Sequence, residues 1–197
     1  MKAISGMVGI TRGSVRICGI DALEQRERAM SQVGCLIDAP SLYEHLSAEE
    51  NLALAARYYP EVSRPRIAEV LELVGMESYR RERVATFSYG MRQRLGISLA
   101  LLARPQLLIL DEPGSGMDIE GMVQIREIIK NSAAVGAAVL ISSHLAFEVE
   151  QCATQVAIIN SGKLHRVAPL QAIRADYPNV EEYYLAQVRQ ARGERAS

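Results

Sequence analysis

The sequence has no tryptophan, and aromatic residues make up only 5% of its 197 positions. Aliphatic side chains must therefore fill the core, and a hydrophobic fraction of 49% supplies enough of them for a soluble globular protein. Cysteine is also scarce. The three present, Cys18, Cys35 and Cys152, lie far apart and form neither a disulfide framework nor a zinc-binding spacing. These shortages indicate a protein of a reducing cytoplasm.

Neither an excess of charge nor a long apolar run is present. The 22 Lys and Arg residues are balanced by 23 Asp and Glu residues, for a net charge of -1, which argues against nucleic-acid binding through bulk electrostatics. The most apolar tract, from Ile97 to Leu110, is interrupted by Arg104 and Pro105. It is shorter than the run of about 18 apolar residues that a transmembrane helix needs. The first residues also lack the apolar stretch of a secretory signal.

The length fits one compact domain, in which helices are expected to dominate from about Ser47 to Ala103. Ser47 to Glu50 has the pattern of a capping box, which predicts the start of a helix that Pro60 ends. Apolar residues at helical spacing predict a second helix over 64–74, followed by a glycine as its stop. A third helix is predicted over 91–103.

From Leu107 to Ile159 apolar runs alternate with amphipathic stretches, which predicts parallel βαβ units. The elements predicted outside the helical region are strands at 15–18, 33–37, 107–110 and 137–141, helices at 26–31, 119–132 and 145–152, a hairpin of 155–160 and 163–167, and helices at 170–175 and 180–192. We expect the polar tail after Gly193 to be frayed. In parallel sheets, functional groups gather at the carboxyl ends of the strands. We therefore expect site residues directly after the predicted strands.

The run from Leu107 to Leu110 ends in two carboxylates, Asp111 and Glu112, followed by Pro113. Four aliphatic residues predict a strand buried in the core, with both acids at its tip. An aspartate there can hold Mg²⁺, directly or through water, because this cation prefers hard oxygen ligands. The adjacent glutamate can polarise an attacking water as a general base. The alternative interpretation is a strand followed by a solvated acidic turn.

The segment from Phe87 to Arg94 places a hydroxyl and a glycine directly before a predicted helix. Ser88 and Gly90 would present a hydroxyl, backbone N–H groups and the positive end of the helix dipole to an anion. The alternative interpretation is an ordinary serine N-cap with a glycine turn.

His144 follows the predicted strand 137–141, where its ring would be able to hydrogen-bond a terminal phosphate, although a histidine at a strand end is more commonly a satisfied polar residue. Ser115 to Asp118 follow the acidic pair and its proline directly. Taken together, the order and spacing of these motifs resemble the nucleotide-binding domain of ATP-binding-cassette (ABC) transporters, from Met1 to about Asn160. The stretch 179–188 also resembles the last helix of exporter-type subunits.

The resemblance implies an α/β fold, a P-loop NTPase-like (ABC ATPase) core with a mainly parallel sheet and an inserted helical subdomain. It implies a single ABC ATPase domain over residues 1–197. Within it, 1–46 and 104–168 would form the core, 47–103 the helical subdomain and 169–197 the C-terminal helices.

Residue roles follow from the same resemblance. Residues 87–94 match the LSGGQ-type signature in the variant form FSxGMxQR, and 115–118 resemble the D-loop. Asp111 and Glu112 match the Walker B aspartate and the catalytic glutamate, and His144 resembles the switch histidine. The implied catalytic residues are Glu112 and His144, the implied ATP-binding residues are Ser88, Tyr89, Gly90, Met91, Gln93 and Asp118, and the implied metal ligands are Asp111 and Asp38.

The implied function is that of a subunit that binds and hydrolyses ATP with Mg²⁺. Such a subunit pairs head to tail with a second ABC ATPase chain, in a homodimer or a heterodimer, and drives transport by integral membrane subunits. The segment from Asp38 to His45 would dock on the membrane subunit. No nucleic-acid partner is expected, and the chain would lie in the cytoplasm, peripheral to the inner face of the cell membrane.

Two departures from the family pattern are visible. No G-x-x-x-x-G-K-[ST] motif occurs in the sequence, so the chain resembles an N-terminally incomplete domain that begins inside or right after the phosphate-binding helix. We therefore expect these 197 residues to bind MgATP poorly, because that loop and its lysine normally cradle the phosphates. In addition, Asp38 stands where the family has the Q-loop glutamine. This acid and the FSxGM variant resemble the branch that handles bacitracin and lantibiotics, although a chance substitution would also explain the acid.

Two other functions remain open. The chain would also fit a non-catalytic or truncated ABC chain that donates its signature to a partner's ATP site. A soluble ABC protein that acts on ribosomes or chromosomes fits less well. Ribosomal types usually carry two cassettes and chromosomal types a long coiled-coil insertion, whereas this chain has 197 residues and one signature.

Overall fold

The computed structural model describes residues 1–192, so the tail after Gly193 lies outside the described residues. The chain divides into two compact units, residues 1–142 and residues 143–197. The finer division into a core, a helical subdomain and C-terminal helices stays a prediction.

A parallel three-stranded sheet forms the centre of the first unit. Strands β3 (Val33–Leu36), β4 (Leu107–Asp111) and β5 (Ala138–Ser142) lie in the order β3-β4-β5, with both pairs parallel. The middle strand is the most apolar, and Leu108, Ile109 and Leu110 are fully buried. Helix α5 (Ile119–Ala134) makes the crossover between β4 and β5 that a parallel pair requires. The predicted α/β architecture is confirmed.

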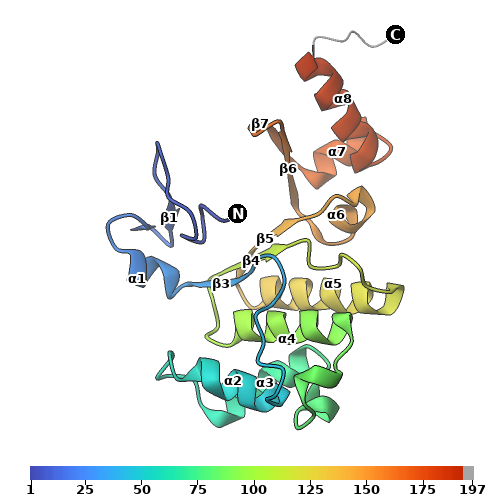
Figure 1. Cartoon of the computed structure of the whole chain (residues 1–197). Helices are drawn as coiled ribbons and strands as arrows, with labels where there is room; N and C mark the ends of the chain where they lie inside the picture. The colour runs from blue at the N-terminus through green and yellow to red at the C-terminus, as the bar shows by residue number, and fades with distance from the viewer. Residues whose placement is uncertain (193–197) are drawn as a thin grey trace. The chain divides into compact units, whose positions relative to one another are not determined.

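Three helices form between β3 and β4, each with a local signal that starts or stops it. Helix α2 (Ala48–Ala56) begins with the predicted capping box, in which the Glu50 N–H donates to Ser47 Oγ at 3.2 Å and the Ser47 N–H donates to Glu50 Oε2 at 2.7 Å. Helix α3 (Arg64–Leu73) stops before Gly75, whose φ of +65° favours glycine. Helix α4 (Tyr89–Leu101) packs against β3 on one side and against α2 and α3 on the other (Figure 1).

Two glycines bring α4 directly onto the sheet. A Cβ atom added to Gly34 in β3 would lie 1.9 Å from the carbonyl oxygen of Ala100 in α4. A Cβ atom added to Gly96 in α4 would lie 2.7 Å from Pro40 Cβ. Because neither position has room for a side chain, α4 lies in backbone contact with β3 at Gly34 and close against Pro40, beyond β3, at Gly96.

The N-terminal residues form short elements. The predicted strand 15–18 is instead a small hairpin of β1 (Arg16–Ile17) and β2 (Ile20–Asp21). The chain turns early because Cys18 and Gly19 both adopt positive φ, as a two-residue hairpin loop requires. Helix α1 (Arg26–Met30) leads into β3. Two 3-10 turns, η1 (Glu77–Tyr79) and η2 (Val84–Thr86), connect α3 to α4.

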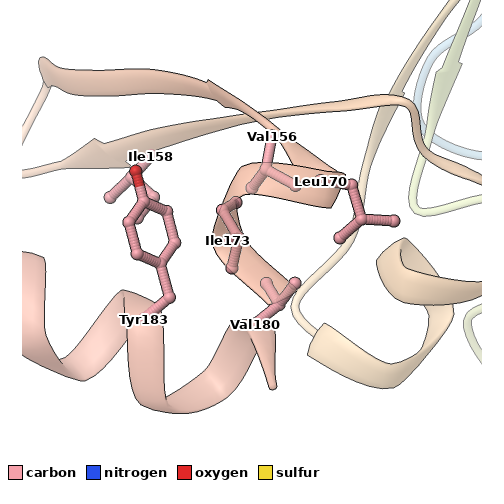
Figure 2. Close-up of a cluster of buried hydrophobic side chains, with 6 residues drawn as sticks. All are labelled: Val156, Ile158, Leu170, Ile173, Val180 and Tyr183. Atoms are coloured by element: carbon pink, nitrogen blue, oxygen red, sulfur yellow. The ribbon is translucent and has the colours of Figure 1, made fainter. Parts of the chain in front are cut away.

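The second unit is a hairpin covered by helices. Helix α6 (Ala146–Cys152) precedes the antiparallel strands β6 (Gln155–Asn160) and β7 (Lys163–Pro169), and helices α7 (Leu170–Asp176) and α8 (Val180–Arg192) follow. The core of this unit consists of the six residues labelled in Figure 2, namely Val156, Ile158, Leu170, Ile173, Val180 and Tyr183. The predicted hairpin and both closing helices are confirmed. Across the described residues, we find no helix with the length and apolar character needed to cross a membrane.

Candidate functional site

The acidic pair lies where β4 ends. The three buried residues before it anchor the strand, Asp111 is its last residue, and Glu112 is the first residue beyond. Both acids are partly buried. Glu112 adopts a φ of +47°, a left-handed conformation that turns the chain sharply away from the sheet. The regular strand therefore ends between these two acids.

A serine of the adjacent strand contacts both members of this pair. Ser142 is the register partner of Asp111 across β4 and β5. Its hydroxyl donates a hydrogen bond to Asp111 Oδ1 and accepts one from the Glu112 N–H at 3.0 Å. Ser142 was not among the site residues predicted from the sequence. The available signal was its place at the carboxyl end of the third apolar run, where parallel strands gather polar groups.

Asp38 lies at the same edge of the sheet, two residues beyond β3. It is exposed and also left-handed, with a φ of +61°. Lys2 Nζ lies 2.7 Å from Asp38 Oδ2. The hydrogen bond and charge of Asp38 raise the pKa of Lys2, and the negative charge of Asp111 adds to this effect. Lys2 thus places a positive charge beside Asp38, one of the two predicted metal ligands, which the sequence did not predict.

The donor atoms of this edge suit Mg²⁺ better than a transition metal. Asp38 and Asp111 offer carboxylate oxygens, the hard ligands that Mg²⁺ prefers. Within residues 1–192 we find no group of three His, Cys, Asp or Glu residues that would enclose a metal. Mg²⁺ in nucleotide sites is commonly held by one or two carboxylates together with waters and phosphate oxygens, so a sparse set of protein ligands fits.

The second candidate region is the N-terminus of α4. Ser88 is the N-cap, and its Oγ accepts a hydrogen bond from the Met91 N–H at 3.3 Å. The N–H groups of Tyr89 and Gly90 are in the first turn, where a helix has no internal acceptor for them. A Cβ atom added to Gly90 would meet no atom within 4 Å, so the surface is open there. This helix end can therefore receive an anion.

Other predicted ligands have different surroundings. The ring of Tyr89 lies against the loop after the acidic pair, since a Cβ atom on Gly116 would be 3.3 Å from Tyr89 Cε1. Met91 is partly exposed, whereas Gln93 is only 3% exposed and its buried Oε1 has no hydrogen-bond partner. Asp118 is the N-cap of α5, where its carboxylate accepts a hydrogen bond from a backbone N–H at 2.8 Å.

Arg92, within the predicted signature segment, connects α4 to the loop after β3. Arg92 donates to the Glu44 carboxylate and also to the carbonyl oxygen of Phe87, at 3.3 Å. In the backbone, the Ala85 N–H donates to the Glu44 carbonyl at 2.9 Å. The loop that follows Asp38 is therefore connected to the residues that precede Ser88.

His144 belongs to the second unit, between β5 and α6, and is exposed. Its predicted role, like those of the other site residues, stays a prediction. Within the first unit, the structure brings Asp111, Glu112 and Ser142 into direct contact, and places Lys2 beside Asp38.

Comparison with protein families gives the affiliation of the chain. Residues 1–115, more than half of its length, match the family described as "ABC transporter". The chain belongs to the ABC transporter family. The matched residues include Asp38, Asp111, Glu112 and the N-terminus of α4, whereas the D-loop-like residues 116–118 and His144 lie beyond the match.

ABC transporter proteins of bacteria are the curated relatives. The chain is 36% identical to the uncharacterised ABC transporter ATP-binding protein YhcH of Bacillus subtilis, over 96% of the chain and 62% of that protein. It is 34% identical to the bacitracin transport ATP-binding protein BcrA of Bacillus licheniformis, over 94% of the chain and 61% of that protein. It is 38% identical to the lantibiotic transport ATP-binding protein SrtF of Streptococcus pyogenes, over 83% of the chain and 70% of that protein. The chain thus spans about three fifths of the first two relatives.

Solved structures agree with the ABC ATPase fold. One, described as an ATP binding subunit of an ABC transporter, superposes with a TM-score of 0.83 at 29% identity, over 95% of this chain and 81% of that one. Another, an ATP-binding cassette in a dimeric post-hydrolysis state with ADP and Pi, superposes with a TM-score of 0.76 at 21% identity, over 86% of this chain and 78% of that one. The second supports the fold alone.

Proposed function

We propose that this chain acts as the ATP-binding and ATP-hydrolysing subunit of an ABC transporter, in a head-to-tail dimer that drives transport by membrane subunits. The observation that supports the proposal is that one unit carries two separate polar regions, each suited to a different part of a nucleotide. One is the carboxylate edge formed by Asp38, Asp111 and Glu112. The other is the open N-terminus of α4 at Ser88 and Gly90.

The carboxylate edge would serve the metal and the attacking water. Asp111, with Asp38, would hold Mg²⁺, which supplies charge neutralisation for the phosphates when bound. Glu112 would accept the proton of the water, and its backbone leaves the strand conformation in which Asp111 stays. The roles of metal ligand and general base would thus fall to two acids that are adjacent in the sequence but differ in backbone conformation. His144 would contribute a hydrogen bond to the terminal phosphate.

The N-terminus of α4 would act on the nucleotide of the other chain. Ser88 and Tyr89 are exposed, so they are available to a molecule outside this chain. The Ser88 hydroxyl and the N–H groups of Tyr89 and Gly90 would donate to phosphate oxygens, aided by the helix dipole. Met91, Gln93 and Asp118 would support this surface.

The loop from Asp38 to His45 would contact the membrane subunit at the inner face of the membrane. Tyr43 has 54% of its surface exposed, and its backbone is held firmly. The Tyr43 N–H donates to Asn51 Oδ1 at 2.9 Å, and Asn51 Nδ2 donates back to the Tyr43 carbonyl at 3.1 Å. A photo-cross-linker at Tyr43 should label a co-purified membrane protein. Labelling confined to the chain itself would contradict this contact.

A complementation experiment tests the dimeric site. Ser88→Arg and Glu112→Gln are each made in a longer chain that adds a G-x-x-x-x-G-K-[ST] segment before Met1. Each variant alone should hydrolyse ATP about 10²-fold more slowly or worse, because general-base loss typically has this effect and Ser88→Arg blocks the anion site. In a mixed dimer, one site combines the intact Glu112 of one chain with the intact Ser88 of the other. An equal mixture should therefore regain roughly a quarter of the wild-type rate, since half the dimers are mixed and each has one sound site.

The possible results separate the candidate functions. Recovery on mixing supports a site shared between two chains. No recovery, in mixtures that still associate, would contradict the shared site. Full activity of Glu112→Gln would show that Glu112 is not the general base. Absence of hydrolysis by the extended wild-type chain would leave the chain only the donation of its Ser88–Gly90 surface to a partner's site.

A further inference from the structure

The hydroxyl of Ser142 lies at the junction of the two acids proposed for catalysis. In the parallel register of β4 and β5, Ser142 is paired with Asp111 at the carboxyl end of both strands. The hydroxyl donates to Asp111 Oδ1 and accepts from the Glu112 N–H at 3.0 Å. A single side chain thus contacts the side chain of one acid and the backbone of the next.

The directions of these two hydrogen bonds determine how each acid is held. A serine hydroxyl has one proton to donate, and here the proton points to Asp111. Asp111 accepts through one carboxylate oxygen, so the bond fixes the rotation of that group. Because the bond engages Oδ1, we assign Oδ2 to a cation.

The backbone of Glu112 needs the second bond. Its φ of +47° is unfavourable for a residue with a side chain and persists only where the surroundings hold it. The Glu112 N–H comes directly after the last residue of β4, and the Ser142 hydroxyl is its acceptor. Loss of this acceptor would allow Glu112 to relax toward an extended conformation, which would swing its carboxylate to another direction.

We propose that Ser142 is a positioning residue that orients Asp111 toward the cation and holds Glu112 in its left-handed turn. The proposal rests on the proposed function, because it assigns Ser142 to the site of that reaction. Ser142 acts only through the two acids. Threonine at this position would keep the hydroxyl and satisfy both bonds, whereas alanine would remove both.

The test uses the full 197-residue chain with Ser142→Ala and Ser142→Thr. Ser143→Ala is the matched control, since the Ser143 hydroxyl accepts instead from the Leu145 N–H, at 3.0 Å, in the turn before α6. The first readout is amide hydrogen exchange of Glu112, measured by NMR and normalised to Leu110 to remove any global loss of stability. Ser142→Ala should speed Glu112 exchange about tenfold, the effect of losing one net hydrogen bond, whereas Ser142→Thr and Ser143→Ala should leave it near wild type.

The second readout is the affinity for Mn²⁺ alone, measured by electron paramagnetic resonance. Ser142→Ala should weaken Mn²⁺ binding several-fold, and Ser142→Thr should restore it. Unchanged Glu112 exchange in Ser142→Ala would overturn the proposal, as would measurable but equal Mn²⁺ affinities of wild type and Ser142→Ala. If Glu112 exchange responds as expected but the wild type binds no Mn²⁺, the metal site of the proposed function fails and the hold on Glu112 is supported.

Discussion

Lys2 Nζ lies 2.7 Å from the carboxylate of Asp38, so one of the two predicted metal ligands already has a cationic partner from the start of the chain. Both side chains are about half exposed or more, at 49% and 67%. The pair is therefore screened by solvent and readily exchanged for another cation. The position of this lysine affects how strongly the edge attracts a divalent ion.

Lys2→Met should increase the affinity for Mn²⁺, because the ion would no longer compete with an ammonium group for Asp38. We expect an increase of a few-fold at low salt that shrinks as ionic strength rises, since the groups are exposed. Titration of Mn²⁺ at two salt concentrations measures it. Lys130→Met, on the exposed face of α5, is the charge-matched control. Equal effects of both substitutions would show that only net charge matters.

Gly34→Ala should destabilise the first unit strongly. The added Cβ would overlap the Ala100 carbonyl and also lie 2.9 Å from Pro105, so α4 must move. Overpacking of this kind typically costs about 1–3 kcal/mol, and a clash with backbone belongs at the upper end. Gly9→Ala is the control, since its Cβ would meet no atom within 4 Å. Urea unfolding compares the two, and a small loss for Gly34→Ala would contradict the close contact.

The capping box of α2 gives a prediction for acid conditions. Its hydrogen bond from the Ser47 backbone N–H lowers the pKa of Glu50. A carboxylate with a lowered folded pKa contributes stability above its unfolded pKa of about 4.3, and this contribution is lost as the pH falls through the folded value. Glu50→Gln should therefore reduce stability at pH 7 but have little further effect in acid below both values.

Thermal unfolding across this pH range measures the effect. Glu61→Gln is the control, because Glu61 is an exposed glutamate outside any helix. A penalty for Glu50→Gln that does not change with pH would contradict a charge-dependent cap.

Substitution of Arg92 should reduce stability more than substitution of Glu44, although the two residues form one ion pair. Glu44 is 61% exposed, so Glu44→Gln should cost at most about 1 kcal/mol. Arg92→Met also removes the donor to Phe87 and to the Ala85 carbonyl, at 3.3 and 3.5 Å, and should cost about 1–2 kcal/mol. Urea unfolding of both single variants and the double variant tests this order. Equal losses would show that the carbonyl contacts contribute nothing.

Elements of the fold were predictable where the sequence carries a local signal. The capping box at Ser47 marked the start of α2, and the run before Asp111 marked a buried strand, because in each case the residues that decide the structure are close in sequence. The hairpin at Cys18 was missed because a cysteine with positive φ gives no composition signal. Helix α4 begins at Tyr89 rather than Met91, directly after its N-cap serine.

The candidate site was predictable only in its separate parts. Asp111 and Glu112 follow from their position after an apolar run. Ser142, in contrast, depends on the register between two strands that are distant in the sequence. Likewise, Lys2 and Asp38 come into contact only in the folded chain, and no sequence pattern around Lys2 indicates this ion pair. Local sequence patterns predict which residues lie at the ends of strands. Which of these residues are in contact depends on how distant segments pair in the folded chain.

Asp38 and Glu112 share a left-handed backbone at the points where their strands end, and neither is glycine. This conformation is unfavourable by roughly 1–2 kcal/mol for a residue with a side chain, whereas glycine adopts it readily. Replacing either acid by glycine would therefore relieve strain while removing a proposed ligand or base. The carboxylate edge thus represents a trade-off between stability and activity, and the most thermostable variants at these two positions should be the least active ones.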